Sequence, residues 1–497
     1  MTDTVRVHPD DPVGHVAPAV HGHFVEHLGR CVYGGLWVGD DDRVETVDGV
    51  RTDSLDLLAA LDPPVVRWPG GCFADDYDWT DGVGPRAARP RRRNLWWAQG
   101  RAETFEESNA FGTEEFLRVC RALDAAPYLA GNVGTGSPDE LLDWVEYCNY
   151  DGDTEYTRLR AESGHEDPHD VRWWGVGNEN WGCGGDFAPD EYARQYRRFA
   201  NHLDAFERKM RPDRDLELVG CGHVSEGWNR EFLAELGDAD RLDHLSVHRY
   251  LECGDDADFT DDQYFRLLAR ARQVGTDVDR AAAAVDTYAP GADVGVVVDE
   301  WGVWHPQAVD SNGLEQANTV RDALVAADVL HQLYRRADRV TMANLAQAVN
   351  VLQCVVQTDA EAAWPTPTYR VFEQFRPHAG ATALRTVVDT ASLSFEGEAH
   401  DLPLVSASAS RSEDGLFVSL SNRSLDEERA VRVDAGLDET PAVDASVLFA
   451  DLSVEDYSTR ATADAFAASP LDAEAAADGT VTVAAPPHSV VTLAVGD

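Results

Sequence analysis

The sequence predicts an α/β fold, a (β/α)8 TIM barrel with a C-terminal antiparallel β-sandwich domain that is jelly-roll-like. From about residue 17 to 378, eight short apolar runs alternate with amphipathic stretches, which is the pattern of a parallel barrel surrounded by helices. After residue 378 the chain changes to short alternating runs separated by Gly, Asp and Pro, which is typical of antiparallel strands. A chain of 497 residues is also too long for one compact core.

The eight predicted barrel strands are apolar on both faces, as buried parallel strands should be. They are AVHGHFVEH near residue 20, PPVVRWPGG near 66, APYLAGNVG near 130, VRWWGVGNE near 175, LELVGCGH near 219, LDHLSVHRY near 247, DVGVVVDEW near 297 and RVTMANLAQ near 343. Helices are expected between them. SPDELLDWVEYC begins with Ser137 as N-cap, Pro138 at the first helical position and Glu140 at the third, which is a capping box.

The C-terminal runs include LPLVSASAS, GLFVSLSNRS and SVVTLAVGD. The run TVRVHP lies before the barrel and could join them, which would bring both ends of the chain into one sandwich. We therefore expect a catalytic barrel domain over residues 17–378 and a β-sandwich domain formed by residues 1–16 plus 379–497.

The charge is extreme, with 42 basic and 89 acidic residues and a formal net charge of −47. Such a surface repels nucleic acid and anionic membranes, so neither is an expected partner. It also repels itself, which suggests a halophilic protein from a salt-rich cytoplasm. The alternative is an acidic protein from an ordinary cytoplasm. No apolar run reaches the length of a membrane helix and the N-terminus has no secretory pattern, so a cytoplasmic location is expected.

The eight cysteines form neither a CxxC pair nor a zinc-like ladder. In a large chain with no secretory signal, free thiols are the better interpretation.

Two acidic residues stand at the ends of predicted strands four and seven, where a barrel of this kind places its active site. These are Glu179 and Glu300. Glycoside hydrolysis needs such a pair, one carboxyl group to protonate the leaving oxygen and one to attack the anomeric carbon. Arg67 and Tyr250 could hold Glu300 ionised, whereas the tryptophans around Glu179 (Trp173, Trp174 and Trp181) could favour its protonated form.

The same segments resemble those of glycoside hydrolase family 51, the α-L-arabinofuranosidases. The matching stretches include RWPGGCFADDYDWTDGVGPR, WWGVGNENWGCGG, DHLSVHRY and VDEWGVWHP, and they run through the whole barrel in order. The resemblance implies that Glu179 is the acid/base and Glu300 the nucleophile. It further implies substrate-binding roles for a set of five residues: Glu26, Cys72, Asn178, Tyr250 and Gln347.

The family also implies a substrate. We expect a retaining, exo-acting enzyme that releases terminal non-reducing α-L-arabinofuranosyl residues from arabinan, arabinoxylan or derived oligosaccharides by double displacement. No cofactor and no metal are implied. A homo-oligomer is implied, since members of the family often form hexamers.

Several alternatives remain open. A β-xylosidase or an endo-β-glucanase could use the same two carboxylates, because pocket walls decide the sugar. His21 and His23 resemble the His-x-His of metal-dependent barrel hydrolases, but that chemistry often needs a strand-end lysine, and the single Lys209 lies in a predicted helix. A catalytically dead binding protein should lack one of the two glutamates, and both are present.

Overall fold

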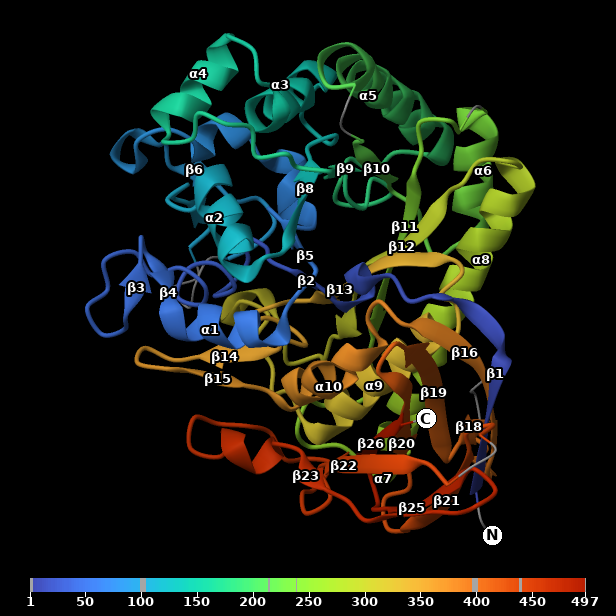
Figure 1. Ribbon diagram of the computed structural model, residues 1–497. Coiled ribbons are helices and arrows are strands. Elements are labelled where there is room, and N and C mark those ends of the chain that lie inside the picture. Colours follow the sequence, from blue (N-terminus) through green and yellow to red (C-terminus); the bar gives the residue numbers. More distant parts are fainter. Residues whose placement is uncertain are drawn as a thin grey trace.

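The computed structural model describes residues 3–98, 104–212, 215–237, 239–395, 401–437 and 440–496. Eight strands form a closed barrel in the order β2-β5-β8-β9-β10-β11-β12-β13, seen in Figure 1. Their bounds are β2 Gly22–Phe24, β5 Val65–Trp68, β8 Ala126–Gly131, β9 Trp173–Val176, β10 Glu217–Gly220, β11 His244–Leu251, β12 Gly295–Val303 and β13 Val340–Ala346. Each overlaps one of the eight predicted runs, so the barrel prediction is confirmed.

Helices surround this barrel. They are α1 Thr52–Leu61, α2 Thr113–Leu123, α3 Pro138–Asn149, α4 Glu155–Glu162, α5 Pro189–Met210, α6 Glu226–Leu236, α7 Asp261–Arg270, α8 Arg272–Tyr288, α9 Val320–Tyr334 and α10 Pro367–Phe375. α3 begins as expected, because Pro138 occupies its first turn and the Ser137 side chain accepts a hydrogen bond from the backbone N–H of Glu140. α5 buries Tyr192, Tyr196 and Phe199 at helical spacing, which explains how it packs on the barrel.

The second domain is a ten-stranded sheet in the order β23-β22-β26-β20-β19-β16-β1-β21-β25-β24. Its strands are β1 Asp3–His15, β16 Thr382–Asp389, β19 Val405–Ser412, β20 Gly415–Asn422, β21 Arg429–Asp434, β22 Ala442–Leu448, β23 Ser469–Pro470, β24 Ala473–Ala475, β25 Thr480–Ala485 and β26 Ser489–Gly496. The predicted sheet-rich domain is therefore present. It is not purely antiparallel, because β1 is antiparallel to β16 on one side and parallel to β21 on the other.

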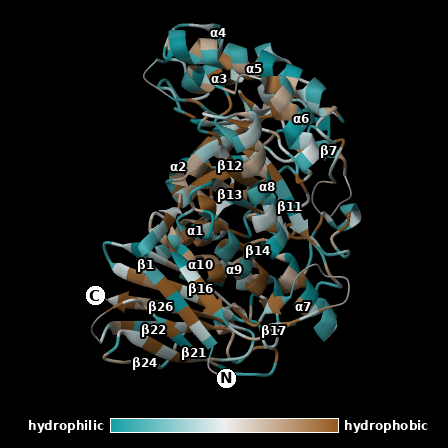
Figure 2. Ribbon diagram, turned by 90° about the vertical axis from the view of Figure 1, so that its right-hand side faces the viewer, coloured by the Kyte–Doolittle hydropathy of each residue, from teal (hydrophilic) through white to brown (hydrophobic). Residues whose placement is uncertain are grey.

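This sheet curls on itself, since β22 and β24 come from opposite ends of the strand order and still contact each other. Its concave side is filled by alternate residues, for example Leu416, Val418 and Leu420 of β20, which are all buried. Figure 2 shows the resulting brown and pale bands along the strands. The alternation of apolar and polar residues follows the two faces of a strand, and on β20 the polar face is covered as well, because Ser419 and Ser421 are buried against α9. Four two-stranded ribbons complete the fold: β3 Thr46–Val47 with β4 Val50–Arg51, β6 Arg92–Arg93 with β7 Glu106–Glu107, β14 Val356–Thr358 with β15 Ala363–Pro365, and β17 Ser392–Leu393 with β18 Leu402–Pro403.

α9 and α10 lie between the barrel and the sheet (Figure 1), and buried polar contacts fix this joint. His331 of α9 bonds Ser406 and Ser419, both at 3.0 Å. Arg423 donates to Asp328 of α9 at 2.7 Å. A buried polar group that loses its partner costs free energy. These contacts therefore favour one orientation of the sheet on the barrel.

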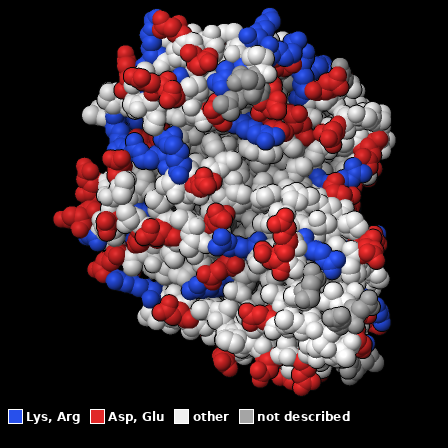
Figure 3. All heavy atoms as spheres, viewed as in Figure 1, with Lys and Arg blue, Asp and Glu red and all other residues white. Residues whose placement is uncertain are grey.

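Acidic groups are spread widely over the face shown in Figure 3, interspersed with basic ones and separated by uncharged surface. They do not gather in one patch on that face. Within the described part of the chain, no helix combines the length and the apolar character needed to cross a membrane.

Candidate active site

Glu179 and Glu300 lie at the carboxyl-terminal mouth of the barrel. Glu300 belongs to β12, and Glu179 follows the end of β9 by three residues. Glu179 has a positive φ of 41°, a conformation that non-glycine residues adopt only where the surroundings hold it. Oxygen atoms of the two carboxylates lie within 4.8 Å of one another. A close pair of this kind fits a retaining glycosidase, in which the carboxyl groups are roughly 5–5.5 Å apart.

Glu300 is almost completely buried and both its oxygens accept hydrogen bonds. Arg67 Nη1 donates to Oε1 and the Tyr250 hydroxyl donates to Oε2, both at 2.7 Å. Charge-assisted hydrogen bonds of this kind stabilise an ionised carboxylate. The partners predicted for Glu300 are therefore found in place. Gly71 leaves room for this carboxylate, because a Cβ at that position would lie only 2.7 Å from Glu300 Oε1.

Glu179 is bonded to His248, whose Nδ1 lies 2.9 Å from Glu179 Oε1. Burial alone would lower the pKa of His248, but the charges of Glu300, Asp299 and Glu179 outweigh it and raise that pKa to about 10. His248 is therefore a cation between two carboxylates. From the sequence, three tryptophans were expected to surround Glu179. Trp173 instead packs on His244, Trp174 on Trp144 and Trp181 on His223. The side chain bonded to Glu179 is a charged imidazole, which is the opposite of the apolar setting that was expected.

Glu26 and Gln347 form the wall next to Glu300. Gln347 Nε2 donates to Glu26 Oε2 at 2.9 Å, and the Trp97 indole donates to Oε1 at the same distance. Burial, together with the nearby charge of Glu300, raises the pKa of Glu26 to about 7. Glu26 can consequently either donate or accept a hydrogen bond near neutral pH.

Asn178 is held from both sides. Its Oδ1 accepts from Arg67 Nη2 at 2.6 Å, and its backbone N–H donates to Asp75 at 2.8 Å. Asp75 also accepts from the N–H groups of Val133 and Gly134, both at 2.7 Å. The buried Asp75 thus joins the segments that follow β5, β8 and β9, a role that its place in the sequence did not reveal.

Cys72 forms a disulfide with Cys183, 111 residues further along the chain. The prediction of free thiols was therefore wrong for these two cysteines, although Cys31, Cys120 and Cys354 are indeed free. Sequence spacing could not reveal the bond, because only the closed barrel brings the segments after β5 and β9 together. Cys183 Sγ lies 3.6 Å from Glu179 Oε2, so the disulfide borders the acid.

The structure thus gathers all seven residues that the sequence singled out around one mouth. Asp299 supports them, since its carboxylate accepts from Tyr128 at 2.8 Å and from Asn344 at 3.1 Å. His21 and His23 lie elsewhere, against Tyr334 and Phe372, and burial lowers their pKa values to about 4 and about 3. They are not part of this mouth.

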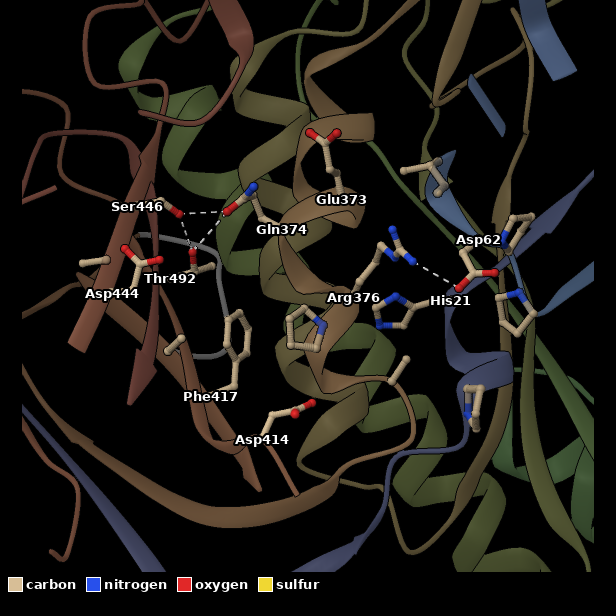
Figure 4. A pocket seen from close by; sticks show the side chains of 18 of the residues that line it. His21, Asp62, Glu373, Gln374, Arg376, Asp414, Phe417, Asp444, Ser446 and Thr492 are labelled. Atoms are coloured by element: carbon tan, nitrogen blue, oxygen red, sulfur yellow. Dashed lines mark hydrogen bonds and ion pairs between the residues drawn. The ribbon is translucent and has the colours of Figure 1, made fainter. Parts of the chain in front are cut away.

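A cavity lies at the other end of the barrel, where the barrel meets the sheet domain. This cavity of about 740 Å³ is bordered by His21, Asp62, Arg376, Ser446 and Thr492, among others. Figure 4 shows their side chains and the ion pair between Asp62 and Arg376. Its barrel residues precede β2 and β5, so it lies at the amino-terminal ends of the strands.

Two carboxylates at this separation, on these strands of a TIM barrel, define a glycoside hydrolase. Comparisons with known proteins narrow the class. Residues 57–265 match the model of the α-L-arabinofuranosidase 1 domain, and residues 299–489 match that of the α-L-arabinofuranosidase C-terminal domain. An intracellular exo-α-L-arabinofuranosidase from Bacteroides ovatus is 35% identical over 99% of this chain and 95% of that protein.

Solved structures agree. The GH51 arabinofuranosidase from Xanthomonas axonopodis pv. citri superposes with a TM-score of 0.92 at 33% identity, covering 99% of both chains. The α-L-arabinofuranosidase from Thermotoga maritima, solved as an arabinose complex, gives 0.84 at 30% identity, again over 99% of both chains. The chain belongs to glycoside hydrolase family 51, the α-L-arabinofuranosidases. A bifunctional glucanase-xylanase at 13% identity shares only the fold.

Proposed function

We propose that this enzyme releases terminal, non-reducing α-L-arabinofuranosyl residues from arabinan, arabinoxylan or oligosaccharides derived from them, with retention at the anomeric carbon. The observation that carries the proposal is the pair of carboxylates, Glu179 and Glu300, with oxygens within 4.8 Å. The relative from Bacteroides ovatus, named an exo-α-L-arabinofuranosidase, supports the mode of action.

The reaction takes two steps. In the first, a Glu300 oxygen attacks the anomeric carbon while the bond to the leaving oxygen breaks, and Glu179 gives its proton to that oxygen. In the second, Glu179 takes a proton from water, the water oxygen attacks the anomeric carbon, and Glu300 leaves as a carboxylate. Arg67 and Tyr250, both 2.7 Å from Glu300, orient the nucleophile. They also stabilise the negative charge that returns to the Glu300 carboxylate at the end of each turnover.

Five residues are proposed to hold the sugar hydroxyls or wall the sugar: Glu26, Cys72, Asn178, Tyr250 and Gln347. Gln347 Oε1 is buried and has no hydrogen-bond partner in the described part of the structure, which leaves an acceptor for a substrate hydroxyl. Cys72 cannot act on the substrate as a thiol. As half of a disulfide it has no S–H to donate, so it forms a wall beside the sugar.

The experiment that tests this function is a panel of aryl glycosides at high salt, comparing α-L-arabinofuranoside with β-xyloside and including a β-glucan. Wild type, Glu179→Ala, Glu300→Ala and the exposed control Glu413→Ala are compared. We expect wild type to turn over only the arabinofuranoside. Both active-site variants should lose this activity, and the control variant should keep it. Azide should restore the Glu179→Ala variant on substrates with good leaving groups, because azide needs no general base. Preference for the xyloside, or full activity in either variant, would overturn the proposal.

Three further properties are proposed. The net charge of −47 supports adaptation to a salt-rich cytoplasm, and unfolding measured as salt is withdrawn tests it. The relative named intracellular supports a cytoplasmic location, which cell fractionation tests. A homo-oligomer, a hexamer by analogy with the family, is tested by light scattering.

A further inference from the structure

A second cluster of ligand-type side chains lies on the outer shell of the barrel. Glu114 is the second residue of α2, and His165 and His169 belong to the segment between α4 and β9. One carboxylate oxygen and one ring nitrogen from each histidine lie within 4.8 Å of one another. The proposed function uses none of these residues.

The carboxylate of Glu114 is buried and its two oxygens differ. Oε1 accepts from the Tyr147 hydroxyl at 2.7 Å and faces His169 Nε2 at 3.0 Å. Oε2 is buried with no hydrogen-bond partner among the described residues, although His165 Nε2 lies only 3.2 Å away. A buried carboxylate oxygen without a hydrogen-bond donor is costly, and a cation beside Oε2 would remove that cost.

Arg121 determines where the protons are. Its Nη2 lies 3.1 Å from His165 Nε2 and its Nη1 lies 3.4 Å from His169 Nδ1. A guanidinium can only donate, so both ring nitrogens accept. His169 then carries its proton on Nε2 and donates it to Glu114. His165 instead points a lone pair between Arg121 and the unpartnered Oε2, and two electron-rich atoms converge at 3.2 Å.

We propose that Glu114, His165 and His169 bind one divalent transition-metal ion, zinc by the nature of the donors, with water as the fourth ligand. Two imidazoles and one carboxylate form a donor set that zinc prefers. In a tetrahedral site with metal–ligand bonds of about 2.0–2.2 Å, neighbouring ligand atoms lie about 3.3 Å apart. The 3.2 Å between Glu114 Oε2 and His165 Nε2 already approaches one edge of this geometry. His169 Nε2 faces the other oxygen, Oε1, at 3.0 Å, so a small rotation of the carboxylate or the ring would bring all three ligand atoms onto one ion.

Binding requires two local changes. The proton of His169 moves from Nε2 to Nδ1, so that Nε2 offers a lone pair to the metal. Arg121 then leaves both rings, which it can do because its side chain is exposed to solvent. Tyr147 remains on Oε1 and orients the carboxylate, as residues behind a metal ligand commonly do. The ion would tie α2 to the segment that leads directly into β9, the strand before Glu179.

The sequence analysis missed this cluster because its residues are distant in the chain. His165 and His169 have the x3 spacing that metal-binding histidines often show, but the carboxylate comes from 51 positions before His165, and only the packing of α2 against the loop after α4 brings it there.

The test uses the full-length protein, freed of metal with a chelator and dialysed, then titrated with Zn²⁺ against a chromophoric competitor. Wild type should bind one ion that His165→Ala and His169→Ala bind at least about tenfold more weakly, a loss of about 1.4 kcal/mol or more. His202→Ala, which alters an exposed histidine on α5, is the matched control and should bind as wild type. Arg121→Ala should bind more tightly, because the competing cation is gone.

Two readouts separate this site from the catalytic one. Zn²⁺ should raise the melting temperature of wild type and of His202→Ala but not of His165→Ala. Arabinofuranosidase activity at 25 °C should be unchanged in His165→Ala. Equal zinc affinity in wild type and His165→Ala would overturn the proposal, as would zinc binding that disappears only when His248 is replaced, since the ion would then occupy the catalytic carboxylates.

Discussion

The two ends of the barrel both carry paired charges, yet they differ in how these charges are held. At the mouth, Arg67 is fully buried and lies 2.7 Å from Glu300, itself 5% exposed. At the floor, the side chains of Arg376 and Asp62 pair at 3.1 Å while 46% and 68% exposed. Buried charges are retained only where neighbouring groups compensate them, and enzymes use such groups to stabilise reacting charge. The difference teaches that burial of paired charge marks the reactive end of the barrel.

The largest expected effect follows from removing one acid at each end. Glu300→Gln should lower kcat/KM about 10⁴-fold or more, because the covalent intermediate can no longer form. Glu373→Gln, which alters a half-buried acid at the floor cavity, should stay within about twofold of wild type, as expected for a residue that touches no reacting atom. Steady-state kinetics on an aryl arabinofuranoside measures both. A large loss in the floor variant would mean that the cavity takes part in catalysis.

The free energy of unfolding should also depend more on charges at the mouth than on charges at the floor. Arg67→Met removes one of the two buried cations, Arg67 and His248, that lie beside Asp299 and Glu300, and should cost about 3–5 kcal/mol of unfolding free energy. Arg376→Met removes only an exposed pair, worth about 0–1 kcal/mol. Urea unfolding at fixed salt compares the two variants. Similar losses would show that the mouth is less desolvated than its burial indicates.

The disulfide between Cys72 and Cys183 lies at the mouth of the barrel, beside Glu179. Cys183→Ser removes the link between the segments after β5 and β9, and should lower the free energy of unfolding by about 2–4 kcal/mol. We also expect a raised KM, because Glu179 lies beside the bond. Cys354→Ser, at a buried free thiol, is the control for KM. A reductant should reproduce the effect of Cys183→Ser in wild type and leave the variant unchanged.

The barrel could be predicted from the sequence because each strand is a local apolar run, and the two glutamates because strand ends converge at one mouth. His248 was visible as a strand-end residue, but its charge was not, since that depends on two carboxylates of β12 and one that follows β9. The disulfide, the Asp75 brace and the parallel pairing of β1 with β21 are long-range events that no local pattern encodes. The domain division at residues 16/17 and 378/379 stays a prediction.

The last expected effect, on the pH dependence of stability, contrasts the histidines of the two ends, His248 and His21. The pKa of His248 is raised to about 10 in the fold, so the folded state binds the extra proton and this stability, full below about pH 6.5, is lost as pH rises toward 10. Burial lowers the pKa of His21 to about 4, so the unfolded state binds more protons and stability is lost as pH falls from about 6.5 toward 4.

Unfolding free energies measured from pH 4 to 10 should therefore separate the two variants. His248→Asn should flatten the alkaline side of the stability profile and His21→Asn the acid side. Each variant serves as the control for the other, because every other titrating group is shared. If both variants changed the acid side of the pH profile, the positive charge assigned to His248 would be wrong. Glu179 would then have no buried cation beside it, and the contrast drawn between the mouth and the floor of the barrel would fail.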